Sequence, residues 1–267
     1  MRARISRPAL LNASKRCVVL ARMIVLLTDF GVEGPYMGQM KAVLYRKAPG
    51  IPIVDLFADL PAFNPRAAAY LLPAYINEFP YGSVFLCVVD PGVGSTRKPL
   101  VIHADERWFV GPDNGLFNIV CKRAHELRRW AITSKPHDIS ASFHGRDLFA
   151  PEAARLALGG DVAGKLLDAS DNPWVSWPDD LFEVIYLDHY GNAMTGVRAC
   201  QLELSHRLVI KKRVVSFART FSAVRSHEPF WYENANGLVE IAVREGDVSR
   251  MLGLQIGDRF NIQKQPT

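Results

Sequence analysis

From Met23 onward the chain alternates short apolar runs with longer segments of helical periodicity. The apolar runs are residues 23–27, 51–57 and 83–89, with further strands near 100–103 and 108–110, and the helical segments are 35–48, 64–79, 114–123 and 151–158. Short, β-branched runs bounded by turn residues are typical of buried strands. This β-α-β-α-β order predicts an α/β domain of three layers around a mostly parallel sheet. In such sheets ligands gather at the carboxyl ends of the strands.

The pattern changes after Gly159, where the sequence becomes rich in turn residues and loses its periodicity. Beyond this stretch come short β-like runs at 182–187, 208–215, 237–243 and 259–262. Short strands separated by turns favour a small β-barrel or sandwich, and we predict a small β-barrel. We therefore expect an α/β domain over residues 23–177 and a β-barrel domain over 181–267.

The positive charge of the chain is concentrated at its start. The sequence has a formal net charge of +5, but residues 1–22 hold six of its 32 Lys and Arg residues and no acid. The remainder has 26 basic against 27 acidic residues, so nucleic-acid binding has no electrostatic support. We interpret residues 1–22 as a disordered basic extension or an upstream start, with a targeting segment as the alternative.

The apolar runs and the cysteines indicate the cellular compartment of the protein. No apolar run approaches the roughly 20 residues of a membrane span, so the sequence excludes an integral membrane protein and predicts no membrane partner. The four cysteines lie far apart and form neither a disulfide framework nor a CxxC metal pattern: Cys17, Cys87, Cys121 and Cys200. We expect a cytoplasmic protein with no bound metal.

Four polar clusters follow predicted strands, where ligands are expected. They are Thr28-Asp29-Phe30-Gly31, residues 90–97, residues 111–115 and residues 143–147. Each also has a structural interpretation: a helix cap or turn for the first, an Asp90–Arg97 salt bridge for the second, loop stabilisation for the third and a structural His144 for the fourth. No single cluster decides between the two interpretations.

Together the clusters match the motifs of one family. The motifs are TDFG at 28–31, YMGQMKAV at 36–43, DPGVGSTR at 90–97, GPDNGL at 111–116, SFHGRDLFAP at 142–151, DHYGNAMT at 188–195, NGLVEIAV at 236–243 and LGLQIGD at 252–258. The sequence resembles the S-adenosylmethionine hydrolases, also called S-adenosylmethionine hydroxide adenosyltransferases, over residues 23–263. The resemblance agrees with the two domains drawn above. It also implies a homotrimer whose sites lie between one subunit's large domain and a neighbour's small domain.

The resemblance implies a reaction in which water attacks the ribose 5′ carbon of S-adenosylmethionine, giving adenosine and L-methionine. S-adenosylmethionine is then the small-molecule substrate, and no cofactor is expected. Halogenating relatives use fluoride or chloride instead and lack the Asp/His pair of the hydrolases. A halide-using adenosyl transferase and a non-catalytic nucleoside-binding protein are the alternatives.

Three residues match the catalytic triad of the hydrolases: Asp90, Arg97 and His144. A neutral His144 has the pKa range to accept a proton from water. Arg97 is suited to fix Asp90 through a bidentate pair and to favour a hydroxide-like oxygen. The sequence leaves open which of the three is the base.

The resemblance also implies residues that bind the substrate. Asp29 matches the carboxylate that accepts both ribose hydroxyls, Asp188 the acid that meets the methionine ammonium, and Asn192 the residue that reads the adenine edge as donor and acceptor. Three aromatic residues match the pocket that packs on the nucleoside: Phe63, Phe143 and Phe221. For each Phe taken alone, core packing is the alternative.

The sequence departs from the family at three positions. Gly34 stands where Asp is frequent, Ala235 where relatives carry Ser, and Gly196 where Asn is usual. These departures concern the methionine end of the substrate rather than the triad. A related adenosyl sulfonium, or a halogenated or chain-shortened nucleoside, is therefore an alternative substrate.

Overall fold

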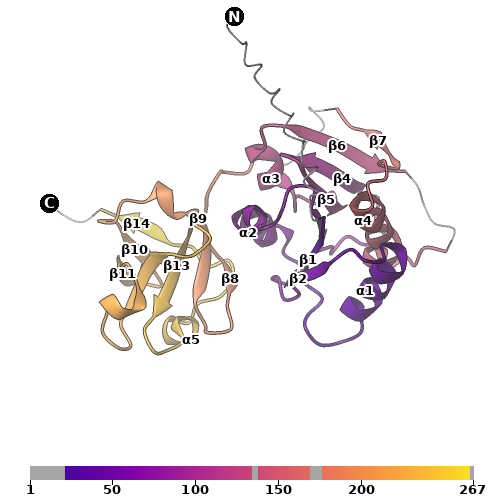
Figure 1. Ribbon diagram of the computed structural model, residues 1–267. Helices are drawn as coiled ribbons and strands as arrows, with labels where there is room; N and C mark the ends of the chain where they lie inside the picture. Colours follow the sequence, from indigo (N-terminus) through magenta and orange to yellow (C-terminus); the bar gives the residue numbers. More distant parts are fainter. Residues whose placement is uncertain (1–21, 134–137, 169–175, 265–267) are drawn as a thin grey trace, which may run out of the picture.

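A seven-stranded sheet forms the centre of the first half of the chain (Figure 1). The computed structural model describes residues 22–133, 138–168 and 176–264. The strand order is β2-β1-β3-β5-β4-β6-β7. The strands are β1 (Ile24–Thr28), β2 (Ile53–Phe57), β3 (Val84–Val88), β4 (Pro99–Ala104), β5 (Arg107–Pro112), β6 (Leu127–Ile132) and β7 (Gly164–Leu166).

This sheet is mixed, which corrects the expectation of a mostly parallel one. Strands β2, β1, β3 and β5 pair in parallel, whereas β4 is antiparallel to β5 and β6, and β7 is antiparallel to β6. The reason is the link between β4 and β5, which consists of Asp105 and Glu106, both at positive φ. A two-residue connection closes a hairpin, because a parallel crossover needs about a dozen residues or more.

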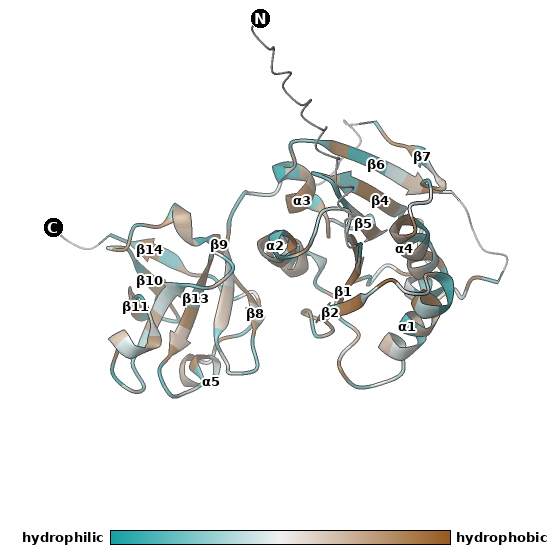
Figure 2. Cartoon of the chain, in the orientation of Figure 1, coloured by the Kyte–Doolittle hydropathy of each residue, from teal (hydrophilic) through white to brown (hydrophobic). Residues whose placement is uncertain are grey.

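Helices cover both faces of this sheet. On one face α1 (Tyr36–Lys47) and α4 (Ala150–Ala157) share a core with the strands, and on the other face α2 (Pro65–Tyr75) and α3 (Asn118–Arg123) do so. The start of α2 follows from local sequence, since Asn64 accepts a hydrogen bond from the Ala67 N–H and Pro65 occupies the first helical position. Figure 2 shows apolar residues concentrated on the central strands and hydrophilic residues in the connecting loops.

A second seven-stranded sheet follows, in the order β14-β10-β11-β12-β13-β9-β8. Its strands are β8 (Leu181–Leu187), β9 (Ala193–Arg198), β10 (Arg207–Ile210), β11 (Arg213–Phe217), β12 (Pro229–Glu233), β13 (Leu238–Val243) and β14 (Asn261–Gln263), and the short helix α5 (Val248–Leu252) precedes β14. The sheet curls until β8 exchanges backbone hydrogen bonds with residues 257–260, just before β14. The expected small barrel is therefore a curled mixed sheet, because only these few bonds join its two edges.

Helix α2 lies between the two sheets in Figure 1 and packs on both. Its apolar side chains share one core with Leu181 and Ile185 of β8 and Leu238 of β13. The Tyr70 hydroxyl also donates to the Pro178 carbonyl at 2.6 Å. The first sheet ends at Leu166 and the second begins at Leu181, while the domain limits 23–177 and 181–267 stay a prediction.

The predicted basic extension lies outside the described residues except for Arg22. The Arg22 side chain lies close to Gly82 and Gly159 of the first half. Within the described residues, no helix is long and apolar enough to cross a membrane.

Candidate active site

A pocket of about 340 Å³ opens at the carboxyl ends of the neighbouring parallel strands β1 and β3. Asp29 directly follows β1, and Asp90 comes two residues after β3. Five of the nine predicted site residues line this pocket: Asp29, Phe63, Asp90, Phe143 and His144. The expectation that ligand-binding groups gather at these strand ends therefore holds for the first half of the chain.

Asp90, Arg97 and His144 come together in one hydrogen-bonded chain. The Arg97 Nε donates to Asp90 Oδ1 at 2.8 Å, and Arg97 Nη2 donates to Asp90 Oδ2, which makes a bidentate pair. Arg97 Nη2 also lies 3.0 Å from His144 Nδ1. The side chains of Asp90 and Arg97 are only 5% and 9% exposed, so the pair is largely withdrawn from water.

Local sequence explains how Arg97 returns to Asp90. Two consecutive turns follow Asp90, since the Val93 N–H donates to the Asp90 carbonyl and the Ser95 N–H donates to the Gly92 carbonyl. Gly94 has φ of +80°, and a Cβ at this position would lie 2.9 Å from the Ala141 carbonyl oxygen. Only glycine fits such a position, which brings this loop against the segment that carries His144.

The contact with Arg97 bears on the role of His144. A guanidinium only donates hydrogen bonds, so a hydrogen bond between these two atoms requires Nδ1 to accept. In that arrangement Arg97 competes with water for the Nδ1 lone pair, which bears on the hypothesis that neutral His144 accepts a proton.

A hydrogen bond joins Asp29 and Phe63, which both line this pocket. The Phe63 N–H donates to Asp29 Oδ2 at 3.0 Å. Phe63 has φ of +59° and a side chain 76% exposed, a conformation and exposure that are unusual for a large apolar residue. Burial raises the pKa of Asp29, against the lowering effect of backbone hydrogen bonds. An exposed ring beside a carboxylate suits a ligand with an apolar face and hydroxyl groups.

The sequence analysis missed two aromatic residues of this pocket, Phe30 and Tyr36. Both rings contact Phe143 edge-to-face, with centroids 5.7 Å and 5.5 Å away. Phe143 itself is buried, so it supports the wall as well as lining it. Phe30 and Tyr36 stand inside quoted motifs, and that position was the signal that could have identified them.

Three of the four remaining predicted residues lie in a different pocket, of about 480 Å³, on the second sheet: Asp188, Asn192 and Phe221. The fourth, Arg97, lines neither pocket and is connected to the first one through its contacts with Asp90 and His144. Asp188 Oδ1 accepts the N–H groups of Tyr190 and Asn192, and Asp188 Oδ2 accepts Asn192 Nδ2 at 2.9 Å. Asn192 therefore uses one of its two amide N–H donors on Asp188, and its second N–H and its carbonyl oxygen are left to contact a ligand.

Four further polar residues line this second pocket and were not among the predicted site residues: Tyr190, Tyr232, Glu240 and Glu245. The Tyr232 hydroxyl donates to Glu240 Oε1 at 2.5 Å, across the antiparallel pair β12 and β13. Burial raises the pKa of Glu240, and the Asp188 charge raises it further. A glutamate inside the apolar run 237–243 was the sequence signal for this residue.

The predicted site is thus divided between two pockets of the same chain. No described residue lines both of them. The first offers Asp90 and His144 of the triad, the Asp29 carboxylate and an apolar wall, and Arg97 is bound to Asp90 outside the lining. The second offers carboxylates and an amide. Within the described parts of the chain, no group of three or more His, Cys, Asp or Glu residues is arranged to hold a metal ion.

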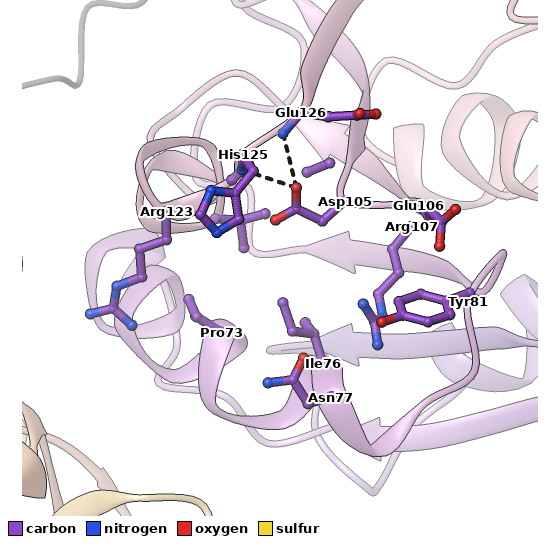
Figure 3. A pocket seen from close by; sticks show the side chains of 13 residues that line it. Pro73, Ile76, Asn77, Tyr81, Asp105, Glu106, Arg107, Arg123, His125 and Glu126 are labelled. Atoms are coloured by element: carbon purple, nitrogen blue, oxygen red, sulfur yellow. Dashed lines mark hydrogen bonds between the residues drawn. The ribbon is translucent and has the colours of Figure 1, made fainter.

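A larger pocket, of about 660 Å³, lies beside the β4–β5 hairpin at the opposite ends of the strands (Figure 3). Its Asp105 carboxylate is occupied by the backbone N–H groups of His125 and Glu126, each at 2.9 Å. None of the predicted site residues lines it. Eight of the nine predicted site residues therefore line the two smaller pockets rather than this one.

Several known proteins are similar to this chain over most of its length. An (R)-S-adenosyl-L-methionine hydrolase of Thermus thermophilus is 37% identical over 252 residues, which cover 88% of this chain and 97% of that protein. The crystal structure of an uncharacterized conserved protein from Thermotoga maritima has a TM-score of 0.82 at 30% identity, covering 91% of this chain and 100% of that one. A fluorinase of Nocardia brasiliensis is more distant, at 23% identity over 218 residues, 68% of this chain and 73% of that protein.

Two family descriptions match consecutive parts of the sequence. The SAM hydroxide adenosyltransferase N-terminal domain matches residues 24–164, which include the whole triad, and the corresponding C-terminal domain matches residues 182–261, which include the second pocket. Since the two matches span both sheets and both pockets, this chain belongs to the SAM hydroxide adenosyltransferase family.

Proposed function

We propose that this protein hydrolyses S-adenosylmethionine to adenosine and L-methionine. The observation that carries the proposal is that Asp90 and His144, both in contact with Arg97, line the same pocket as Asp29 and Phe63. This arrangement places a group that can activate water next to a group that can hold a ribose. The hydrolase names of the relatives support the same reaction.

The reaction is a displacement at a primary carbon. A water oxygen forms a bond to the ribose 5′ carbon while the bond from that carbon to sulfur breaks, and the bonding electron pair stays on sulfur as the neutral thioether of methionine. The water loses one proton to solvent or to a basic group. A sulfonium is a good leaving group, so the enzyme's task is to position water and stabilise it as hydroxide. No cofactor is needed for this chemistry.

Arg97 is the residue best placed to favour hydroxide. Its guanidinium is always protonated, and Asp90 holds it in one orientation through both carboxylate oxygens. Its contact with His144 Nδ1 suits a neutral imidazole, in which case the charge of Arg97 is not opposed by a second cation. We infer that the fixed positive charge stabilises a hydroxide-like nucleophile and that His144 orients the water.

The nucleoside end of the substrate fits the same pocket. Asp29 accepts the ribose hydroxyls, and the exposed ring of Phe63 packs on the nucleoside together with Phe143. The second pocket supplies Asp188 for the methionine ammonium and the Asn192 carbonyl oxygen for the amino group of adenine.

We infer that the complete site forms between subunits of a homotrimer. The two sets of binding residues lie in separate pockets of one chain, and exposed apolar side chains are present at both, namely Phe63 at the first and Tyr190 at the second. A neighbouring copy that sets its second pocket against the first one would complete the substrate contacts. The free thiols of the described cysteines support a reducing location, which we take to be the cytoplasm.

The reaction is tested by incubating purified protein with S-adenosylmethionine, with and without fluoride or chloride, and identifying the products by mass spectrometry. Adenosine and methionine in equal amounts, independent of halide, are expected. A 5′-halogenated nucleoside would indicate the halide-using alternative. Intact substrate after long incubation, with bound nucleoside, would indicate a binding protein.

The divided site is tested by subunit complementation. His144→Ala removes a group of the first pocket and Asp188→Ala a group of the second, so each variant alone is expected to be nearly inactive. When the two chains are co-expressed, some interfaces contain an intact copy of each pocket and activity returns. A mixed protein as inactive as its parents would place the whole site within one chain.

A further inference from the structure

Glu240 is a buried carboxylate with no cationic partner in the parts of the chain that the structure describes. Its side chain is on β13 and only 2% of the residue is exposed. Its hydrogen bonds come from neutral donors, the Tyr232 hydroxyl at 2.5 Å and Asn234 Nδ2 at 2.8 Å. An ionised carboxylate in such a place costs folding free energy unless a positive charge compensates it.

A second carboxylate faces the same pocket. Asp188 is also bound only by neutral donors, the backbone N–H groups of Tyr190 and Asn192 and the Asn192 amide. The pocket of about 480 Å³ is lined by three carboxylates, and no described Lys or Arg lines it. Glu245 is paired with Arg244 at 3.4 Å, which leaves Asp188 and Glu240. Two negative charges that no side chain balances favour a cation supplied by the ligand.

We propose that Glu240 is a positioning residue that makes this pocket selective for a primary ammonium group, the amino end of the amino-acid part of the substrate. The proposal rests on the proposed hydrolase function and extends it from the reacting centre to substrate selection. Glu240 acts through Tyr232, whose single hydroxyl proton is directed to Glu240 Oε1. The oxygen lone pairs of Tyr232 are thereby offered as acceptors, alongside the Asp188 carboxylate, to a group that has three N–H donors.

A structural role for Glu240 does not explain its charge. The residue lies in the middle of the sheet, paired with Tyr232 on β12 and with Met194 on β9. A neutral side chain there would avoid the cost of burying a carboxylate next to Asp188, which raises the pKa of Glu240 further. The charge is accounted for when a cation enters the pocket during the reaction.

The test compares S-adenosylmethionine with its desamino analogue, which lacks only the ammonium group. In Glu240→Gln we expect KM for S-adenosylmethionine to rise by about ten- to a hundredfold, since a hydrogen bond to a charged group is weakened, while kcat changes little. The preference for S-adenosylmethionine over the desamino analogue should fall by the same factor. Affinity for adenosine, measured by calorimetry, should stay as in the wild type, because adenosine has no ammonium.

Two further variants separate positioning from folding. Tyr232→Phe removes only the hydroxyl and should raise KM in the same selective way, and the double variant should be no worse than Glu240→Gln alone because both residues act through one contact. Glu233→Gln is the matched control: Glu233 is exposed and does not line this pocket, so its KM values should be unchanged. If Glu240→Gln does not fold, Tyr232→Phe decides alone.

An unchanged KM for S-adenosylmethionine in a folded Glu240→Gln variant would overturn the proposal, and so would equal losses of S-adenosylmethionine and adenosine affinity. These results leave the hydrolase proposal standing, because wild-type turnover is measured in the same series. If the wild type does not cleave S-adenosylmethionine, the hydrolase proposal fails. Calorimetric affinities for S-adenosylmethionine and the desamino analogue then still decide whether Glu240 selects an ammonium.

Discussion

Replacing Arg97 by methionine removes the cation that balances Asp90. The Asp90 side chain is 5% exposed and loses both hydrogen bonds of the bidentate pair, so its charge is left buried without compensation. Removal of one partner from a buried ion pair typically costs about 3–5 kcal/mol. We expect the free energy of unfolding of Arg97→Met, measured by urea denaturation at pH 7, to fall by about this amount. S-adenosylmethionine hydrolysis should be lost as well.

A double variant and a control separate the effects on stability and activity. Asp90→Asn combined with Arg97→Met removes both charges, so most of the lost stability should return while hydrolysis does not. Lys41→Met breaks the ion pair with Asp55, whose side chains are 31% and 42% exposed, and should cost only about 0–1 kcal/mol. The reasoning is refuted if Arg97→Met costs no more than Lys41→Met, or if the double variant is no more stable than Arg97→Met.

Three other substitutions test the residue roles and the packing. His144→Ala should lower single-turnover product formation by about 10²–10⁴-fold with adenosine affinity unchanged, the usual worth of general acid–base or water-orienting groups; normal turnover would contradict its role. Asp29→Asn should weaken calorimetric adenosine affinity by about ten- to a hundredfold. Because burial raises the pKa of Asp29, its ionised form destabilises the folded state. This penalty is fully present above the raised pKa and disappears as the pH falls through the ordinary aspartate pKa of 3.8. Urea denaturation should therefore show Asp29→Asn gaining stability relative to the wild type at pH 7 and losing that gain in acid; a difference that does not vary with pH would contradict this. Gly196→Ala should cost about 1–3 kcal/mol, since its Cβ would lie 2.6 Å from Leu181 Cβ, whereas Gly38→Ala has nothing within 4 Å and should not destabilise; equal urea midpoints would refute the packing argument.

The sequence predicts the first half of the site well because chain direction and strand order are simple there. Asp29 and Asp90 follow two strands that are parallel neighbours, so a shared edge follows once the alternation of strands and helices is recognised. The hairpin formed by β4 and β5 was not predicted. Its turn residues, Asp105 and Glu106, adopt positive φ without the Asn-Gly or Gly-rich signal that usually marks such a turn.

The second half of the site depends on register, which a sequence does not display. Glu240 was visible as an acid within an apolar run, but its partner Tyr232 follows only from the antiparallel pairing of β12 and β13. In the same way, Arg97 and His144 were expected to meet, whereas the pairing of Arg97 Nη2 with His144 Nδ1 required coordinates. The departure at Gly196 also has a physical reason, because Leu181 leaves no room for a side chain.

Helix α2 has a consequence for how the chain folds and how it can be divided. Its apolar residues complete one core together with Leu181, Ile185 and Leu238, so the interior of the first sheet continues into the second. Cutting the chain in the linker before Leu181 would expose these three side chains to water. It would also expose the face of α2 that packs on them. Although sequence comparison matches the two halves separately, we expect them to unfold in a single transition because they share this core. Neither half is expected to fold well when moved into another protein.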